Sequence, residues 1–132
     1  MEIKYQTGVI PETTAIIEVY ESSGINRPTS DAERIRDMYA HSDLIITAWD
    51  RDKLVGISRA LTDFCYCCYL SDLAVRLDYQ KKGIGKKLIA LTKQEAGEQV
   101  TLILVAAPAA RDYYPKIGME RIEDGFLIKR SS

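Results

Sequence analysis

A short glycine-containing segment offers the clearest chemistry in this chain of 132 residues. Gln80-Lys81-Lys82-Gly83-Ile84-Gly85 lies between a β-favouring run and a stretch with helical periodicity. Glycine lets backbone N–H groups approach an anion closely, and a helix that begins here adds unpaired amides and the positive end of its dipole. The segment therefore predicts a loop that binds a phosphate-like group.

Two common phosphate-binding patterns do not fit this loop. A dinucleotide-binding loop has a third glycine where Leu88 stands, and the P-loop of nucleoside triphosphatases has a Ser or Thr where Lys87 stands. The local charge does suit an anion, because five basic residues and one acid between Arg76 and Lys87 give +4. With a net charge of −1, the rest of the chain carries −5, which argues against nucleic acid as a partner.

The counts of histidine and cysteine remove whole classes of reaction. His41 is the only histidine, so a metal centre built on several imidazoles is excluded, and its expected role is to interact with a helix end. Cys65, Cys67 and Cys68 have no second cysteine pair and no helix start after them. We expect small apolar fillers of a strand in a reducing compartment, and no metal site.

The elements that must position the loop follow from hydrophobic periodicity and turn residues. The spacing of apolar residues predicts helices over 11–22, 31–41 and 83–96, and a short helix between Pro108 and Gly118. β-Favouring runs predict strands over 2–7, 44–49, 54–61, 66–77, 100–105, 119–122 and 126–128. The fold class is therefore α/β (α+β), in the order β-α-α-β-β-β-α-β-α-β-β. The length suits one core and a single domain over 1–132.

The fourth predicted strand contains an irregularity. Leu73, Val75 and Leu77 alternate, but Leu70 and Leu73 are three residues apart, so the two-residue period slips at Ser71-Asp72. One extra residue in a strand is a β-bulge, and bulges often lie beside sites. The helix over 83–96 then leads to the apolar run at 100–105, which predicts a right-handed βαβ unit with parallel strands.

With this loop and element order, the chain resembles a small single-domain member of the GNAT superfamily of acyl-CoA-dependent N-acetyltransferases. The loop of that family reads Gln or Arg, two residues, Gly, one residue, and Gly or Ala, which Gln80 to Gly85 matches. The family's preceding strand ends in a Leu-x-Val-like run, here Leu73-Ala74-Val75, and a later helix carries Tyr114 to Met119 in the family's pattern. The resemblance implies a GNAT-like mixed central sheet whose bulged fourth strand is splayed from the fifth to admit CoA.

The resemblance also implies roles for individual residues. Tyr114 would protonate the departing CoA sulfur, because a phenol with a pKa near 10 is protonated at neutral pH. Tyr113 is the alternative acid, since Pro115 can re-aim that turn. Asp72 on the bulge is the best-placed carboxylate for the base, with a relayed water as the alternative. The implied cofactor-binding residues are Leu73, Ala74, Val75, Gln80, Lys81, Lys82, Gly83, Ile84, Gly85 and Lys86.

The acceptor side is less defined by the sequence. The residues that could line an acceptor pocket are Asn26, Arg27, Arg59, Tyr66 and Tyr69. The implied function is transfer of an acetyl group from acetyl-CoA to a primary amine of a small molecule or peptide, by direct attack in a ternary complex. The alternative is a non-catalytic acyl-CoA-binding sensor or interaction module.

The sequence carries no sign of a membrane partner. Its longest nearly apolar run, 100–107, is shorter than the roughly 18 residues of a membrane span, and the start lacks a basic region followed by an apolar one. We expect a cytoplasmic protein. A homodimer is one oligomeric state that the sequence allows.

Overall fold

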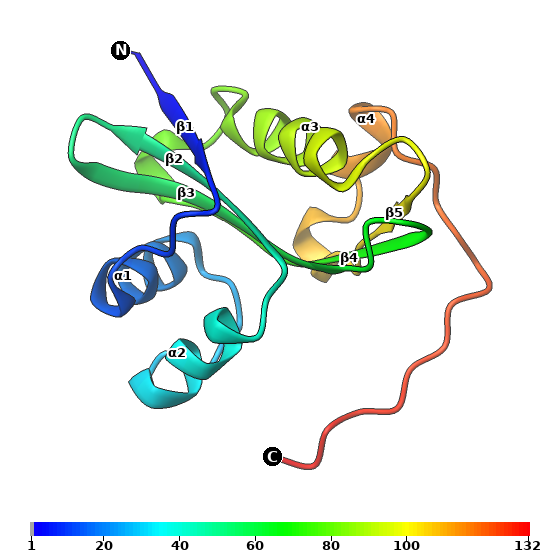
Figure 1. Cartoon of the computed structure of the whole chain (residues 1–132), viewed down its shortest axis with the longest axis horizontal. Helices are drawn as coiled ribbons and strands as arrows, with labels where there is room; N and C mark the ends of the chain where they lie inside the picture. Colours follow the sequence, from blue (N-terminus) through cyan, green and yellow to red (C-terminus); the bar gives the residue numbers. More distant parts are fainter. Residues whose placement is uncertain (1) are drawn as a thin grey trace.

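A five-stranded sheet in the order β1-β2-β3-β4-β5 forms the centre of the molecule (Figure 1). The computed structural model describes residues 2–132. The strands are β1 (Lys4–Thr7), β2 (Leu44–Asp50), β3 (Lys53–Thr62), β4 (Cys67–Val75) and β5 (Thr101–Ile103). The first four pair antiparallel, whereas β5 runs parallel to β4. This mixed sheet confirms the predicted fold class.

Helices cover both faces of the sheet and bury two clusters of apolar side chains (Figure 1). On one face, α1 (Thr13–Ser23) and α2 (Ala32–Ala40) bury Ile16 and Ile35 against the sheet. On the other face, α3 (Ile84–Ala96) buries Leu88 beside Leu70. Three single turns complete the fold, and they are η1 (Leu77–Tyr79), η2 (Pro108–Ala110) and α4 (Tyr113–Lys116). No helix among residues 2–132 has the length and apolar character needed to cross a membrane.

The predicted bulge lies where the sequence period slips. Arg59 pairs with Asp72 and the next residue, Ala60, pairs with Leu70, so Ser71 is the extra residue of β4. A bulge bends its strand and increases the local twist. The bend therefore occurs just before Leu73, where β4 approaches the glycine loop.

The sheet opens between β4 and β5. These strands pair only from Cys67 with Thr101 to Tyr69 with Ile103. Among residues 2–132, β4 from Leu70 to Val75 therefore has no strand partner on that side. The helix α3 connects the two strands, which confirms the predicted parallel βαβ unit. The predicted splay is present, and it opens toward the end of β4 that carries the loop.

The prediction of two final strands is wrong. Residues 119–122 and 126–128 are irregular, and all of them except the half-buried Met119 are exposed. They belong to a segment, 119–132, that extends away from the body (Figure 1). A β-favouring run forms a strand only with a partner, and an isolated two-stranded hairpin is at best marginally stable in water. The predicted strand 66–77 is also too long, because β4 ends at Val75 and η1 follows.

The loop before β4 corrects the expectation for the cysteines. Cys68 is buried, but Cys65 and Cys67 are exposed. Asp63 organises this loop by accepting hydrogen bonds from the amides of Cys65, Tyr66 and Cys67, which lower its pKa to about 2. Only Cys68 therefore acts as an apolar filler of the strand.

Candidate active site

The glycine loop presents unpaired amides to an open space. Gly83 has φ of 85°, a left-handed conformation that favours glycine, and it caps the N-terminus of α3. The amide of Lys87 donates to the Gly83 carbonyl at 3.1 Å, so the amides of the first helical turn before it have no partner within the helix. A Cβ added at Gly83 would meet no atom within 4 Å. The loop therefore has room for an anion beside these amides.

Exposed lysines surround the loop. Lys81, Lys82 and Lys86 are all exposed, and the Lys82 ammonium lies 5.7 Å from the centre of the Tyr79 ring. Tyr79 is held in turn by a 2.6 Å hydrogen bond from its hydroxyl to Asp50. The positive charge predicted for this segment thus lies on the surface beside the loop, where solvent and salt screen it.

The open edge of β4 leads to the loop. The Arg76 amide donates to Val55 of β3, so the Val75 carbonyl, on the opposite edge, faces the opening toward β5. Gln80 donates from Nε2 to this carbonyl at 2.9 Å. The main-chain groups of Leu73 point to the same edge, because successive residues of a strand alternate. The loop and the end of the strand therefore form one continuous surface.

Tyr113 and Tyr114 begin α4, and the Tyr113 side chain reaches the start of α3. Their ring centres are 5.3 Å apart in an edge-to-face arrangement. The Tyr113 hydroxyl lies 3.7 Å from the position that a Cβ would take at Gly85. Pro115 falls in the first turn of α4, where its missing N–H removes no helical hydrogen bond. Both hydroxyls therefore remain candidates for the acid.

The two tyrosines differ in their surroundings. Tyr113 is 39% exposed, whereas Tyr114 is half-buried. Burial, and to a smaller extent the charge of Tyr113, raise the pKa of Tyr114 above its ordinary value. Tyr114 therefore holds its proton to a higher pH than an exposed tyrosine does.

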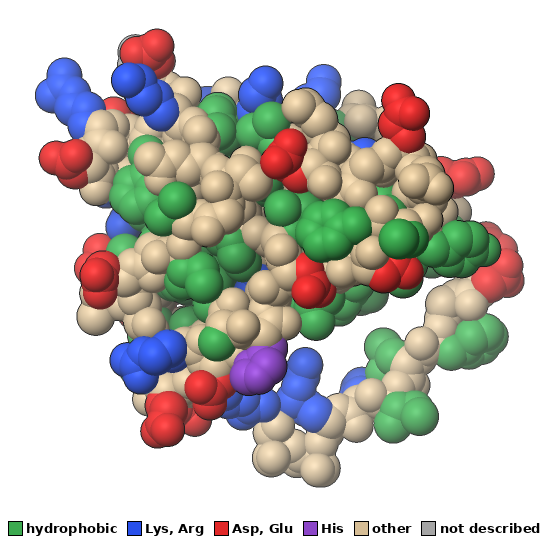
Figure 2. Space-filling model, viewed as in Figure 1, with side chains coloured by type: hydrophobic (Ala, Val, Ile, Leu, Met, Phe, Trp, Pro, Cys, Tyr) green, Lys and Arg blue, Asp and Glu red, His purple; other side chains and the backbone are tan. Residues whose placement is uncertain are grey.

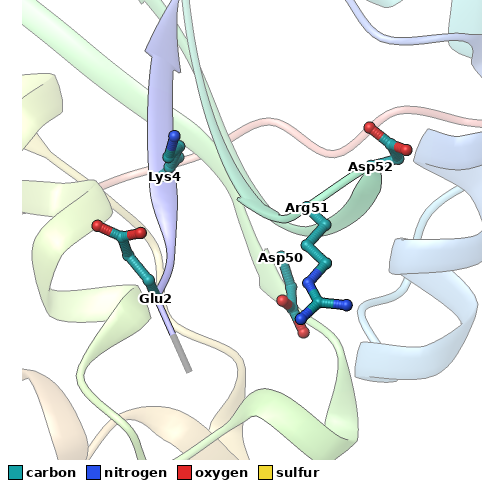
Figure 3. A pocket seen from close by; sticks show the side chains of 5 residues that line it. All are labelled: Glu2, Lys4, Asp50, Arg51 and Asp52. Atoms are coloured by element: carbon teal, nitrogen blue, oxygen red, sulfur yellow. The ribbon is translucent and has the colours of Figure 1, made fainter.

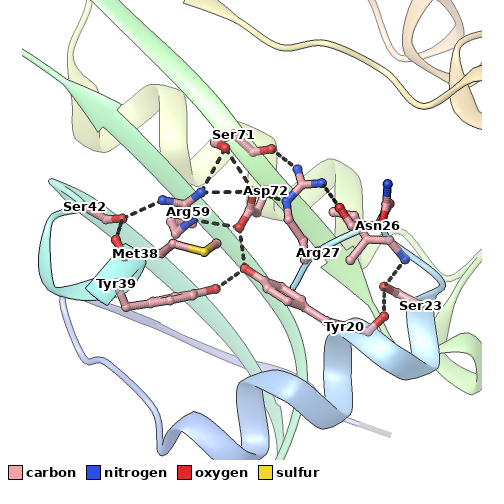
Figure 4. Close-up of polar contacts among 11 residues, drawn as sticks. Tyr20, Ser23, Asn26, Arg27, Met38, Tyr39, Ser42, Arg59, Ser71 and Asp72 are labelled. Atoms are coloured by element: carbon pink, nitrogen blue, oxygen red, sulfur yellow. Dashed lines mark hydrogen bonds and ion pairs between the residues drawn. The ribbon is translucent and has the colours of Figure 1, made fainter. Parts of the chain in front are cut away.

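Asp72 is fully buried at the centre of a polar network on the bulge (Figure 4). Its Oδ1 accepts from Arg27 Nε at 2.7 Å, and its Oδ2 accepts from Arg59 Nε at 2.7 Å and from the Tyr20 hydroxyl at 2.6 Å. The hydroxyls of Tyr20 and Tyr39 also share a hydrogen bond. The carboxylate thus joins both helices of one face to the bulge.

The network keeps Asp72 ionised. Burial by itself raises the pKa of this carboxyl, but the hydrogen bonds and charge of Arg59, with Tyr20 and Arg27, outweigh it and lower the pKa. Two cations and a phenol already occupy the carboxylate oxygens. The geometry favours Asp72 as an anchor of the bulge over Asp72 as a group that accepts a proton.

The predicted acceptor residues fall into two groups. Arg27 donates to the Ser71 carbonyl and to the Asn26 carbonyl, each at 2.7 Å, and Arg59 donates to Ser71 Oγ at 3.0 Å. Three of the residues therefore gather at the bulge. Tyr66 and Tyr69 instead line an apolar hollow of about 320 Å³ at the paired ends of β4 and β5, with Leu61, Cys67, Cys68, Thr101 and Ile103.

Sequence analysis missed Tyr20 and Tyr39, which it assigns only to apolar helix faces. Both side chains are fully buried and take part in the network of Asp72. Burial strongly raises the pKa of each phenol, so both stay protonated. A tyrosine within an apolar stripe is the one signal in the sequence, because a buried hydroxyl needs a polar partner.

A larger hollow of about 850 Å³ lies at the β2–β3 turn, away from the opening of the sheet (Figure 3). It is lined by charged side chains, namely Glu2, Lys4, Asp50, Arg51 and Asp52. None of the residues predicted for the cofactor, the acid or the base is among them. We assign it no role in the chemistry.

The arrangement of loop, opened sheet and tyrosine helix agrees with one known family. A family model described as an acetyltransferase (GNAT) domain matches residues 15–128. The chain belongs to the GNAT family. The match includes the bulge, the glycine loop and both tyrosines.

Individual acetyltransferases are similar to this chain at low sequence identity. The chain is 29% identical over 99 residues to an uncharacterized N-acetyltransferase, ycf52, of Porphyra purpurea, covering 70% of this chain and 57% of that protein. The chain thus spans little more than half the length of this relative. Among solved structures, a probable acetyltransferase from meticillin-resistant Staphylococcus aureus superposes with a TM-score of 0.82 at 22% identity, over 98% of this chain and 100% of that one.

A third GNAT comparison concerns the ligand. An aminoglycoside N-acetyltransferase in complex with CoA superposes with a TM-score of 0.75 at 12% identity, over 99% of this chain and 96% of that chain. At this low sequence identity, the similarity shows that the two chains share a fold.

Among residues 2–132 we find no group of three or more His, Cys, Asp or Glu side chains that could hold a metal ion.

Proposed function

We propose that this chain transfers an acetyl group from acetyl-CoA to a primary amine. One observation carries the proposal: β4 separates from β5 after Tyr69, and its free edge from Leu70 to Val75 leads to the loop that presents unpaired amides at the start of α3. The amides of 84–86 and the lysines beside them would bind the pyrophosphate of CoA. The main-chain groups of Leu73 and the amide of Val75, whose carbonyl already accepts from Gln80, would pair with the amide groups of the pantetheine arm.

The transfer needs several proton movements. The ammonium loses one proton to water, the neutral amine attacks the thioester carbonyl carbon to form the new C–N bond, and the nitrogen gives a second proton to water as the C–S bond breaks. The departing sulfur takes a proton from the Tyr114 hydroxyl, with Tyr113 as the alternative donor, and the tyrosine regains a proton from solvent. A main-chain amide at the opened edge of β4 would stabilise the oxyanion that develops on the carbonyl oxygen.

Two cysteines, Cys67 and Cys68, do not favour a covalent acetyl-enzyme. Burial is the largest effect that raises the pKa of the Cys68 thiol, and the charge of Asp63 is the largest for Cys67. A thiol with a raised pKa has little thiolate at neutral pH and is a weak nucleophile. This supports direct attack by the amine in a ternary complex.

The geometry supports a relayed water as the base. Asp72 is buried and its oxygens are occupied by Arg27, Arg59 and Tyr20. We therefore assign Asp72 as a positioning residue that holds the bulge, and Arg27 and Arg59 as its partners. A substrate carboxylate that approached Arg27 would compete with the bonds this side chain already makes.

An acceptor panel tests the proposal. The purified chain is mixed with acetyl-CoA and, in turn, with amino acids, polyamines, aminoglycosides and lysine peptides, and free CoA thiol is measured. Initial rates at varied concentrations of both substrates should give intersecting double-reciprocal lines, whereas parallel lines would indicate an acetyl-enzyme. Binding of acetyl-CoA with no thiol release above the amine-free rate across the panel would favour the sensor.

A further inference from the structure

Two exposed thiols lie one residue apart at the turn between β3 and β4. Cys65 and Cys67 are both exposed, whereas Cys68 is buried. The turn lies at the end of the sheet beside β5 (Figure 1). Figure 2, which colours cysteine with the apolar residues, shows such side chains at the surface in this part of the molecule. The acetyl transfer proposed above uses neither thiol, so their place in the fold needs another account.

The turn keeps these two cysteines close to each other. Asp63 Oδ1 accepts from the amides of Cys65 and Cys67 at 2.8 and 3.1 Å, so both residues fold around one carboxylate. The chain bends over 64–66. Two residues of chain span at most about 7 Å when fully extended, and a bent chain spans less. The Cα atoms therefore lie in the range of roughly 4.4 to 6.8 Å that a disulfide requires.

The third cysteine does not compete for this pairing. Cys68 has no exposed surface and belongs to the apolar cluster that packs against α3. Its side chain points to the opposite face of β4 from Cys67, because successive residues of a strand alternate. A bond between Cys68 and Cys65 would need the Cys68 side chain to leave the core.

The peptide group between the two thiols holds β5. The Thr101 amide, at the first residue of β5, donates to the Tyr66 carbonyl at 2.9 Å. The ladder that follows is short, since β4 and β5 pair only from Cys67 with Thr101 to Tyr69 with Ile103. The Tyr66 carbonyl therefore supports one end of a ladder of three residue pairs.

We infer that Cys65 and Cys67 form a reversible disulfide, by exchange with a small-molecule disulfide, and that this bond loosens the attachment of β5 to β4. A disulfide across one residue closes a small ring, and its preferred torsion constrains the backbone of Tyr66. The carbonyl that accepts from Thr101 belongs to that ring. Strain in a small ring also makes the bond easy to reduce, as a switch requires.

The exchange proceeds in two balanced steps. The charge of Asp63 is the largest effect that raises the pKa of Cys67, so Cys65 is the thiol that we expect to react first. Its thiolate attacks one sulfur of the small disulfide, forms a mixed disulfide and releases one small thiolate. Cys67 Sγ then loses its proton to water and attacks the Cys65 sulfur, and the second small thiolate leaves. Two protein thiols are oxidised, and one small disulfide is reduced to two thiols.

One consequence of this switch rests on the proposed function. β4 and β5 separate directly after Tyr69, and the edge of β4 beyond that point is where the pantetheine arm would pair. A looser β5 would change the width of this opening, so the oxidised chain should bind acetyl-CoA more weakly than the reduced chain. The disulfide itself and its effect on β5 are tested without acetyl-CoA.

Thiol counting in the full chain tests the bond. After treatment with glutathione disulfide, the unfolded protein should have one thiol that reacts with an alkylating reagent, against three in the reduced chain. Its intact mass should fall by about 2 Da, with no glutathione attached. Alkylation should map to Cys68. Three remaining thiols, bound glutathione without ring closure, or alkylation at Cys65 or Cys67 would overturn the inference.

Single serine substitutions identify the partners. Cys65→Ser and Cys67→Ser should each leave a mixed disulfide with glutathione on the remaining exposed thiol. Cys68→Ser is the matched control, because it removes a thiol of the same turn that faces the core, and it should still close the ring. Failure of the oxidised Cys68→Ser chain to close would assign the bond to Cys68 and overturn the pairing.

Hydrogen exchange measures the effect on β5. In the oxidised chain the Thr101 amide should exchange roughly 2- to 10-fold faster than in the reduced chain, the range expected for loss of one hydrogen bond. The Gly8 amide, which donates to the Ile45 carbonyl at 2.9 Å near the other edge of the sheet, is the internal control and should not change. Reduction with dithiothreitol should restore the slower rate. Equal exchange of Thr101 in both forms would overturn the effect on β5.

Titration of both forms with acetyl-CoA keeps the two proposals separate. Weaker binding by the oxidised chain supports the switch, and equal binding would overturn its effect on the opening. Absence of binding by the reduced chain would instead contradict the proposed function, while the thiol count and the Thr101 exchange would still decide the disulfide.

Discussion

At the scale of single residues, the proton on Tyr114 separates an enzyme from a binding module. Tyr114→Phe keeps the ring and its packing against Tyr113 but removes the donor. We expect kcat to fall by roughly 10²- to 10⁴-fold, the usual contribution of a general acid, while acetyl-CoA affinity stays within about twofold. Thiol-release kinetics and a thermal-shift titration measure the two quantities.

Tyr113→Phe is the matched control for this prediction, because the two tyrosines are neighbours in one helical turn. A loss confined to the Tyr113 variant would move the acid to that residue, whose hydroxyl lies beside Gly85. Full activity in both single variants and in the double variant would rule out a tyrosine acid and leave solvent as the donor.

The surroundings of Tyr114 also predict how kcat depends on pH. The acid must be protonated, so activity is lost as the pH rises through the pKa of Tyr114. Burial raises this pKa, so the basic limb of the kcat profile that belongs to Tyr114 should lie above about pH 10. The same limb should be missing in Tyr114→Phe, and a limb that persists there would belong to another group.

Asp72→Asn tests whether this carboxylate anchors the bulge or acts as the base. Loss of its charge leaves Arg27 and Arg59 without their buried partner. Breaking a buried ion pair from one side costs about 3 to 5 kcal/mol, so the free energy of unfolding in urea should fall by that amount. Asp52→Asn, at an exposed position in the β2–β3 turn, is the control and should change stability little.

The pH dependence of stability gives Asp72 a second readout. Its pKa is lowered in the folded state, so its contribution is complete above the unfolded value near 3.9 and is lost as the pH falls through the lower folded value. The stability gap between wild type and Asp72→Asn should therefore narrow below about pH 4. A variant that kept its stability but lost kcat would support the role of base instead.

At the scale of elements, the glycine loop is where strand, turn and helix meet. Gly83→Val places a β-branched side chain at φ of 85° and in the space beside the free amides. We expect acetyl-CoA to lose its thermal shift with this variant, because both the backbone conformation and the access to it are disturbed.

Gly24→Val separates strain from binding. Gly24 caps the C-terminus of α1 with φ of 81°, and a Cβ there also meets no atom within 4 Å. Its backbone strain should therefore match that of Gly83→Val, while the loop that faces CoA is untouched. Equal loss of the acetyl-CoA shift in both variants would show that strain alone explains the effect.

At the scale of the whole molecule, binding of acetyl-CoA should raise the thermal stability of the folded chain. A ligand that binds only the folded state at about 100 times its dissociation constant stabilises it by roughly 2.7 kcal/mol. For a chain of this size the melting temperature should rise by several degrees with acetyl-CoA. ATP and NAD should give much less, and an equal rise with all three would indicate a general anion site.

Features that depend on nearby residues agree with the predictions made from the sequence. The slip between Leu70 and Leu73 located the bulge at Ser71-Asp72, and the glycine spacing located the N-terminus of α3. Both features are local, because side-chain alternation and helix initiation depend on residues a few positions apart. Patterns of this range could be predicted before the fold was known.

The sequence by itself thus determined the order of the elements up to β5, the bulge and the glycine loop before α3. Only the tertiary structure decided the surroundings of Asp72, whose partners Arg27 and Tyr20 lie 45 and 52 residues away along the chain. The tertiary structure also decided that residues 119–128 form no strand, because these β-favouring residues lie beside no other strand of the described chain. Burial, ionisation and strand pairing depend on contacts between segments that are distant in the sequence, and local periodicity does not predict those contacts.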